Sequence, residues 1–282
     1  ADDTQLYIGC RLQDHEASKQ QLETCITEVR QWMADNMLKL NDDKTEYIVI
    51  GSRHMLRQVP ESLRSIRVGN KTINATSSAR NIGVLVDSAL SMEQQVTNVC
   101  RACYVGLRDV GKIRPYLTED ATKKLVIAFV ISKLDCNNAL LYKISKFLQD
   151  KLQLVQNNAA RLIVKKAKHE SIKETRKKLH WLPIEFRIKY KINLLTFKCL
   201  QNLAPIYLQD LLHPYEPKRD LRSADKGYLR ETKTRTVAGD RAFSNAAPTL
   251  WKKLPDNVRN QESLESFKRE LKTSLFEQAF NI

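Results

Sequence analysis

The N-terminal part of the chain begins with a helical pattern of apolar residues. Apolar positions recur at helical spacing at Leu22, Ile26, Val29 and Met33. They predict an amphipathic helix that ends near Asn36. Ser18 followed three residues later by Gln21 matches a capping box, which predicts that the helix starts there.

Short apolar stretches after this helix predict β-structure. Residues Glu46 to Ile50 predict a buried strand, and residues Asn81 to Val86 predict another. Between them, Gly69-Asn70 separates two short β-type runs, which predicts a hairpin with a two-residue turn. Residues 1–87 are therefore expected to form a first, α+β domain.

From Ser91 onward the apolar period is helical. One stripe consists of Met92, Val96, Val99, Cys103 and Val110, and another of Leu148, Leu152, Val155, Ala159 and Leu162. Between them, residues Leu125 to Leu134 are apolar on nearly all sides, as in a helix that lies between neighbours. We expect a three-helix bundle that ends near Lys168, and residues 88–168 form the second predicted domain.

Residues 169–282 are predicted to form a third, basic and helical domain. Ser171 and Glu174 match another capping box, and Leu182-Pro183 marks the start of a further helix. That helix directs Ile184, Ile188, Ile192 and Leu195 inward. Residues 214–240 are polar and basic without a clear period, which indicates a long loop or arm. A last helix, 263–280, carries Leu264, Phe267, Leu271 and Leu275 on one face. The expected fold class is α+β and mostly helical.

Composition places the chain among intracellular proteins, nuclear or cytoplasmic. It has 282 residues, 42% of them hydrophobic and 28% charged, and only 8 Gly and 8 Pro, which favours long helices over a turn-rich β fold. No run of 18 uncharged apolar residues occurs, so we expect no membrane span. Six scattered cysteines fit a reducing compartment, and Cys100 and Cys103 form a C-x-x-C pair without further ligands for zinc.

The charge distribution changes this picture, because it points to nucleic acid. The formal net charge is +15, yet the first 51 residues hold five basic and ten acidic residues, so the other 231 carry +20. Residues 165–198 hold eleven Lys and Arg against three Glu, interleaved with Trp181, Phe186, Tyr190 and Phe197. Such a patch is typical of a surface that follows a phosphate backbone, and the alternative is an ordinary solvated helix face. The candidate nucleic-acid-binding residues are Lys165, Lys166, Lys168, Arg176, Lys177, Lys178, Arg187, Lys189 and Lys191.

Several segments, in order, resemble a known enzyme family. They are ADDTQLYIGC, QWMADNMLKLNDDKTEYIVIG, RNIGVLVDSALSM, LHWLPIEFRIKYK, APIYLQDLL, LRSADKG and FSNAAPTLWKKLPDNVR. Together they resemble the back half of the reverse transcriptase of non-LTR retrotransposons (LINE elements), close to the jockey and chicken-repeat groups. The resemblance spans essentially the whole chain.

The resemblance implies roles for individual residues. Ala1-Asp2-Asp3 is similar to the catalytic box of the palm, so Asp2 and Asp3 would be Mg²⁺ ligands, and a pair of carboxylates suits two-metal phosphoryl transfer. Lys44 matches the next palm motif, where a lysine lies near the leaving pyrophosphate. The predicted hairpin and residues 80–87 would belong to the primer grip, and the helices of residues 91–168 to the thumb. The implied partners are an RNA template and a DNA primer or target, with no membrane.

The chain also departs from the family pattern. The fingers, the nucleotide-binding palm segments, the third palm aspartate and the upstream endonuclease are missing. We therefore expect a C-terminal fragment of an RNA-directed DNA polymerase that is inactive by itself, although its complete parent would use Mg²⁺. Two alternatives stay open: a stand-alone nucleic-acid-binding helical module, and a decayed element copy without function.

Overall fold

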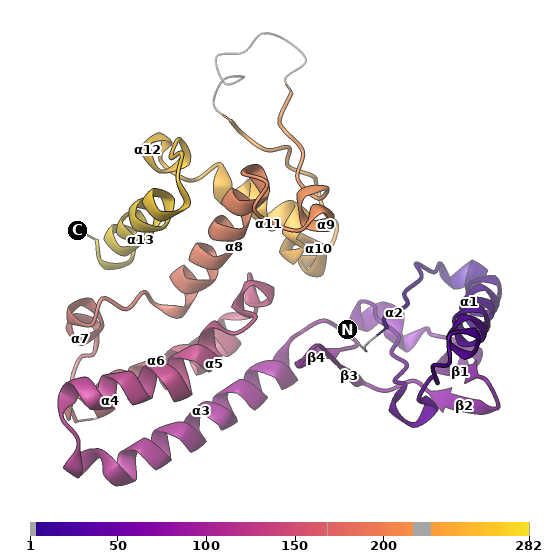
Figure 1. The fold of residues 1–282 in the computed structure, drawn as a ribbon, viewed down its shortest axis with the longest axis horizontal. Helices are drawn as coiled ribbons and strands as arrows, with labels where there is room; N and C mark the ends of the chain where they lie inside the picture. Colours follow the sequence, from indigo (N-terminus) through magenta and orange to yellow (C-terminus); the bar gives the residue numbers. More distant parts are fainter. Residues whose placement is uncertain (1–3, 168, 217–226, 282) are drawn as a thin grey trace. The chain divides into compact units, whose positions relative to one another are not determined.

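The computed structural model describes residues 4–167, 169–216 and 227–281, and these form a mostly helical fold with two small antiparallel sheets (Figure 1). The chain divides into two compact units, Ala1–Gln95 and Val96–Ile282. We call them the N-terminal unit and the C-terminal unit, and the boundary lies within helix α3. Among the helices of the described residues, none has both the length and the apolar composition needed to cross a membrane.

The N-terminal unit combines one long helix with two hairpins. Its elements are α1 (His15–Asp35), α2 (Arg53–Arg57), β1 (Ser65–Val68), β2 (Lys71–Asn74), β3 (Ser78–Asn81) and β4 (Val84–Asp87). Helix α1 confirms the predicted amphipathic helix, but it begins at His15, so the prediction of Ser18 as its first cap was wrong. A capping serine must precede the first helical turn, and Ser18 already lies within it.

The hairpin predicted at Gly69-Asn70 is confirmed. Strand β1 pairs with β2 in antiparallel register, with Val68 opposite Lys71. The single strand predicted for residues 81–86 was wrong, because the chain reverses at Ile82 and Gly83, where φ is +44° and +80°. Two successive positive φ values are those of a tight hairpin turn, and here they join β3 to β4.

The stretch from Glu46 to Ile50, also predicted as a strand, forms a single bridge instead. Tyr47 pairs with Ala75 in parallel orientation, and the backbone N–H of Thr76 donates to the carbonyl oxygen of Tyr47 at 2.8 Å. The phenol of Tyr47 donates to the carbonyl oxygen of Leu63 at 3.0 Å. These contacts attach the segment to the residues just before β1 and just after β2, although the segment is not part of a sheet.

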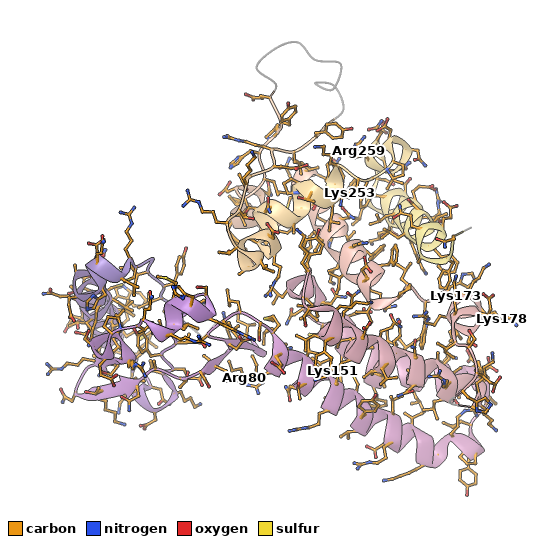
Figure 2. The ribbon with its side chains drawn as sticks, turned by 180° about the vertical axis from the view of Figure 1, so that it is seen from behind. Arg80, Lys151, Lys173, Lys178, Lys253 and Arg259 are labelled. Atoms are coloured by element: carbon orange, nitrogen blue, oxygen red, sulfur yellow. The ribbon has the colours of Figure 1, made fainter. Side chains whose placement is uncertain are left out.

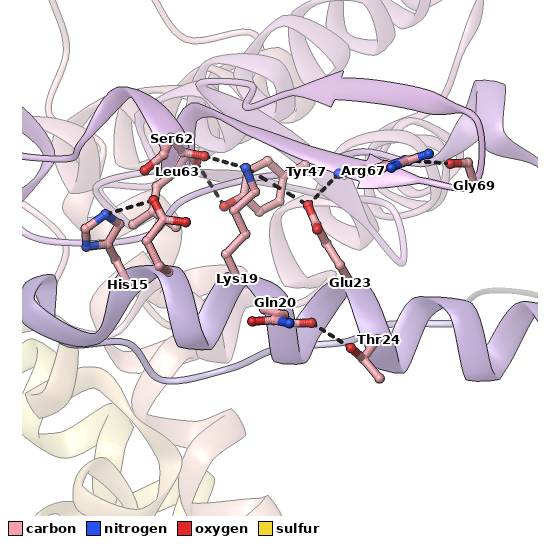
Figure 3. Close-up of polar contacts among 11 residues, drawn as sticks. His15, Lys19, Gln20, Glu23, Thr24, Tyr47, Ser62, Leu63, Arg67 and Gly69 are labelled. Atoms are coloured by element: carbon pink, nitrogen blue, oxygen red, sulfur yellow. Dashed lines mark hydrogen bonds and ion pairs between the residues drawn. The ribbon is translucent and has the colours of Figure 1, made fainter.

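Polar side chains fasten α1 to the first hairpin (Figure 3). The ammonium group of Lys19 donates to the carbonyl oxygen of Ser62 at 2.7 Å, and the carboxylate of Glu23 accepts from the backbone N–H of Arg67 at 2.9 Å. No residue of α1 is fully buried. The buried apolar side chains among the described residues of this unit are Leu63, Ile66, Val68, Val84 and Met92. The N-terminal unit thus has a thin core supplemented by polar contacts.

The C-terminal unit begins with three helical segments that match the predicted bundle. They are α3 (Glu93–Ile113), then α4 (Glu119–Val126) continued through a π-helical turn (Ile127–Ile131) into α5 (Ser132–Asp135), and α6 (Lys146–Val164). Helix α3 and the π-helical turn approach closely at Gly106, where a Cβ atom would lie 3.2 Å from the carbonyl oxygen of Phe129. The guanidinium of Arg114 donates to the carbonyl oxygens of Leu162 and Ile163 at the end of α6, and so closes the bundle.

The other helices of the C-terminal unit follow α6 in the chain. They are α7 (Lys173–Lys178), α8 (Ile184–Leu200), α9 (Ile206–Gln209), α10 (Val237–Arg241), α11 (Phe243–Trp251), α12 (Asp256–Arg259) and α13 (Leu264–Phe280). Helix α8 packs against α6, α11 and α13, and the rings of Phe197 and Phe267 stack at 4.2 Å. The second and third predicted domains are therefore parts of one compact unit, because α6 and α8 share a core.

Two local predictions in this region need correction. The capping box at Ser171 is not formed, because Ile172 precedes α7 with helical φ and ψ and without a side-chain cap. The predicted arm of residues 214–240 is partly folded. Leu229 is buried and bridges to Pro214, and α10 begins at Val237. The middle of this arm, residues 217–226, lies outside the described residues.

Candidate nucleic-acid interface

The residues predicted to be catalytic occupy the N-terminal unit. Asp2 and Asp3 lie outside the described residues. Lys44 ends a short 3-10 turn, Asp42–Lys44, and is exposed. The two carboxylates that precede it are engaged in ion pairs, Asp42 with Arg30 and Asp43 with Lys71. The hydrogen bond from Lys71 lowers the pKa of Asp43, so this carboxylate stays charged as a partner of the hairpin.

The glycine of the first hairpin makes one of these ion pairs possible. Gly69 has φ of +59°, and a Cβ atom there would lie 2.7 Å from Cζ of Arg30. The absence of a side chain lets the guanidinium pass the hairpin and reach Asp42. The turn before Lys44 is therefore fixed in space by α1 and β2 together.

Metal ligands do not cluster in the described part of the chain. Among those residues, no three His, Cys, Asp or Glu side chains are grouped so that they could hold a metal ion. The Mg²⁺ expected from the resemblance would depend on Asp2 and Asp3, which lie outside the described residues. The thiol of Cys103, in the C-x-x-C pair, is buried, and burial raises its pKa to about 12.

Several of the predicted nucleic-acid-binding lysines gather where α6 ends and α7 packs against it. We call Lys165, Lys166, Lys177 and Lys178, together with Lys173, the α6–α7 lysine cluster. Lys173 was not among the predicted binding residues. Lys165 ends α6 in the left-handed conformation, with φ of +54°. Figure 2 shows Lys173 and Lys178 on α7 at the outer edge of the unit. None of the five pairs with a carboxylate of a described residue, and Lys168, which belongs to the same stretch, lies outside the described residues.

Glu170 and Glu174 are the carboxylates nearest to this cluster in the sequence, and neither forms an ion pair with one of its lysines. The side chain of Glu170 accepts from the backbone N–H of Ala167 at 2.8 Å, which closes the turn after α6. The C-terminus of α6 also attracts positive charge, because its last carbonyl groups carry the negative end of the helix dipole. Arg176 is half-buried, and burial lowers its pKa. Its Nε atom is buried without a hydrogen-bond partner among the described residues.

The predicted basic residues of α8 are largely used within the fold. Arg187 forms a two-pronged ion pair with Asp135 of α5, and only 17% of its side chain is exposed. Lys189 pairs with Glu185 at 2.6 Å and lies over the ring of Phe186 at 4.7 Å. Lys191 is half-buried and pairs with no described carboxylate. The nine predicted residues therefore do not form one continuous surface.

Four aromatic residues were expected to lie at the surface among the lysines of residues 165–198. For two of them this expectation was wrong. Trp181 and Phe197 are 6% and 1% exposed, because they fill the core between α8 and its neighbours. Phe186 and Tyr190 are half-buried. Within α8, residues 188, 192 and 197 face the core, and Trp181 joins that core from the segment before α8.

Sequence analysis missed a second surface, formed by α3 and α6. The amide of Asn158 donates to the phenol oxygen of Tyr104 at 3.2 Å, which holds the two helices side by side at the surface. On α6, the ammonium group of Lys151 lies over the exposed ring of Phe147 at 4.4 Å. We call Tyr104, Phe147, Lys151 and Asn158 the α3–α6 stripe. The spacing of four residues between Phe147 and Lys151 was visible in the sequence, but the partner helix was not.

Comparisons of the chain with models of protein families, with curated proteins and with solved structures give no match. The interpretation of the surface therefore rests on the residues described above.

Proposed function

We propose that this chain binds nucleic acid through the α6–α7 lysine cluster, as the C-terminal part of the reverse transcriptase of a non-LTR retrotransposon. The observation that carries the proposal is the convergence of five lysines at one end of the C-terminal unit without a described carboxylate partner. Unpaired ammonium groups concentrate positive potential at a surface, and a phosphate backbone releases its counterions when it meets them.

The α3–α6 stripe supports the same function with a different interaction. Tyr104 and Phe147 are 41% and 64% exposed, so their rings are accessible to unstacked bases. Stacking of a base on an aromatic side chain contributes about 1–3 kcal/mol and depends little on sequence. Lys151 lies beside Phe147 and supplies a charge for the adjoining phosphate. A single strand would therefore find both stacking and charge on this unit.

The assignment to a polymerase rests on the sequence segments that resemble parts of the reverse transcriptase and follow one another in the same order. In this assignment the N-terminal unit is the end of the palm, its hairpins belong to the primer grip, and α3 to α6 are the thumb. The parent reaction would be two-metal DNA synthesis on an RNA template, with Asp2 and Asp3 as Mg²⁺ ligands and Lys44 near the leaving pyrophosphate. The reading frame upstream of Ala1 tests this part. An aromatic residue directly before Ala1, preceded by a further palm aspartate, is expected, whereas a start codon a few residues upstream would refute it.

One structural observation favours a second candidate, a stand-alone nucleic-acid-binding module. Residues Val96–Ile282 form one compact unit with their own core around α8, and they contain the lysine cluster and the stripe. This candidate requires no catalytic residues. It predicts the same binding but no polymerase parent.

Binding is tested by fluorescence anisotropy with a labelled RNA of about 30 nucleotides, over a series of salt concentrations from about 50 to 200 mM. The cluster variant replaces Lys166, Lys173, Lys177 and Lys178 by Gln. We expect its affinity to fall more than tenfold at low salt. The slope of log affinity against log salt should decrease by about 3, since each lost phosphate contact removes about 0.7–0.9.

The matched control replaces four lysines that are already paired with carboxylates. Lys124, Lys146, Lys252 and Lys268 pair with Asp120, Asp150, Glu231 and Glu265 at 2.7, 2.9, 3.1 and 2.7 Å. Both variants lose four positive charges from a net charge of +15, so both reach +11. Equal loss of binding in both would mean that net charge alone attracts RNA, and it would refute the cluster as the site.

A further inference from the structure

The C-terminal unit contains a cavity of about 380 Å³ next to α8. Glu185, Ile188, Lys189 and Asn193 line it from α8, at the spacing of one helix face. The opposite walls come from the loop before α6, from the end of α11 and from α13. This volume lies within the range of small-molecule pockets, and it suits one nucleotide rather than a folded polymer.

A buried polar atom in the wall of the cavity has no partner. Asn193 is 1% exposed, and its Oδ1 atom makes no hydrogen bond to any described residue. Leaving a buried acceptor unpaired costs about 1–3 kcal/mol, which a folded protein rarely accepts without a reason. Asn193 lines the cavity, so a ligand with an N–H donor that reaches its side chain there would give this oxygen the missing partner.

Three of the four charged side chains that line the cavity are lysines. Lys143, Lys189 and Lys253 line it together with a single carboxylate, that of Glu185. Lys189 pairs with Glu185 at 2.6 Å, and Lys143 pairs with Asp240 at 3.0 Å. Lys253, labelled in Figure 2, pairs with no carboxylate of a described residue. Its ammonium group is therefore available to an anion.

Apart from Gln149 and Gln278, the remaining lining residues are apolar or aromatic. Leu141, Leu250, Leu254 and Leu275 contribute aliphatic side chains, and Tyr142 contributes a largely buried aromatic ring. A flat, weakly polar ring would lose little by leaving water for such a wall. The cavity thus combines three demands on a ligand: a hydrogen-bond donor for Asn193, a flat apolar body, and an anionic group for Lys253.

We propose that this cavity holds one nucleotide, with its base against the leucines and a donor of the base on Oδ1 of Asn193, and with its phosphate at Lys253. A nucleotide meets all three demands, because a base carries N–H donors on a flat ring and its phosphate is attached a few bonds away. The choice of a nucleotide among anions rests on the proposed function. The cavity would capture the end or an unstacked base of a bound strand.

The test is isothermal titration of the whole chain with AMP, GMP, CMP and UMP, and with ribose 5-phosphate as a ligand that has the phosphate but no base. We expect one site with a dissociation constant of about 1 mM or tighter for the nucleotides. Ribose 5-phosphate should bind at least tenfold more weakly. Asn193→Leu should weaken nucleotide binding about tenfold, since it removes one hydrogen bond to a buried acceptor.

Stability measurements and further variants distinguish the loss of a ligand contact from the loss of the fold. Asn193→Leu should leave the thermal midpoint of the ligand-free protein unchanged or higher, because it replaces an unpaired polar atom by an apolar side chain of similar size. Lys253→Gln should weaken nucleotide binding without affecting the fold. Lys124→Gln, at an exposed lysine of α4 that pairs with Asp120 outside the cavity, should leave nucleotide binding unchanged. Nucleotide affinities that do not respond to Asn193→Leu or Lys253→Gln would overturn the proposal.

The outcome separates the cavity from the proposed function. Nucleotide binding together with no binding of the RNA of about 30 nucleotides would support the cavity and contradict the polymer interface. Binding of that RNA with a steep salt slope, but no binding of any nucleotide, would overturn the cavity proposal and leave the interface standing. Equal affinities for AMP and ribose 5-phosphate would also overturn it, because the base would then play no part.

Discussion

Arg114 is the residue whose replacement should destabilise the C-terminal unit most clearly. It is 8% exposed and lies in the turn between α3 and α4. Its guanidinium donates to the carbonyl oxygens of Leu162, Ile163 and Leu117 at 2.9, 2.7 and 2.8 Å. Two of these acceptors belong to the last turn of α6, whose carbonyls have no partner within the helix. Arg114, in the turn after α3, therefore caps the C-terminus of α6.

The cost of removing this cap follows from these contacts. Hydrogen bonds that involve a charged group contribute about 1.5–3 kcal/mol each, and buried carbonyls left unpaired add a penalty. Because two of the three bonds are only partly buried, water would replace some of them. We expect Arg114→Met to lower the free energy of unfolding by about 3 kcal/mol or more. For a unit of this size, such a loss lowers the thermal midpoint by roughly 6–12 °C.

The assay must report on the C-terminal unit alone, and the tryptophans allow this. Trp181 and Trp251 are buried in that unit, whereas Trp32 belongs to the N-terminal unit and is 60% exposed. In a Trp32→Phe background, tryptophan fluorescence during urea unfolding follows only the C-terminal unit. Its midpoint and slope give the free energy of unfolding for each variant.

Two further variants decide whether the cap is the cause. Arg101→Met, at an exposed arginine of α3, makes the same chemical change without a cap and should cost less than about 0.5 kcal/mol. Arg114→Lys keeps the charge but cannot reach three carbonyls at once, so it should recover less than half of the loss. A loss below about 1 kcal/mol for Arg114→Met, or full stability of Arg114→Lys, would refute the reasoning.

The remaining predictions concern dynamics, reactivity and catalysis. In hydrogen exchange, the N-terminal unit with its thin core should exchange before the helices of the C-terminal unit, and equal protection of both would contradict this. Alkylation at pH 8 should label exposed Cys136 readily and Cys103 hardly at all, because the raised pKa of Cys103, about 12, keeps its thiol protonated; equal labelling rates, followed by mass spectrometry, would count against it. Primer extension on an RNA template with Mg²⁺ should give no product, and incorporation that Asp2→Ala abolishes would disprove that expectation.

Helices with a clear apolar stripe could be predicted from the sequence. The apolar stripe that ends at Met33 predicted α1. A second stripe predicted α13, and it consists of Phe267, Leu271 and Leu275. Their starts were harder to predict, because a cap depends on the backbone angles of one residue rather than on its identity. Ser263 does cap α13 by accepting from the backbone N–H of Ser266, but Ser171 caps nothing.

The sequence predicted where basic residues are concentrated along the chain, but not which of them lie together on one surface. Which lysine stays free depends on partners far away in the sequence, as the ion pair between Arg187 and Asp135 shows across 52 positions. The cavity depends even more on tertiary packing. Asn193 looks like any other polar residue of a helix until Lys253 and Leu275 are brought beside α8. Periodicity indicates which face is buried but not what meets it.

The polar fastening of α1 to the first hairpin has a calorimetric consequence. A typical domain gains about 12–15 cal/mol/K per residue in heat capacity on unfolding, because it exposes apolar surface to water. The N-terminal unit buries few apolar side chains, and Lys19 and Glu23 connect its helix to main-chain groups instead. Its heat-capacity increment should therefore be small, which gives a flat dependence of stability on temperature. Cooling would then weaken this unit less than it weakens the helical unit that follows.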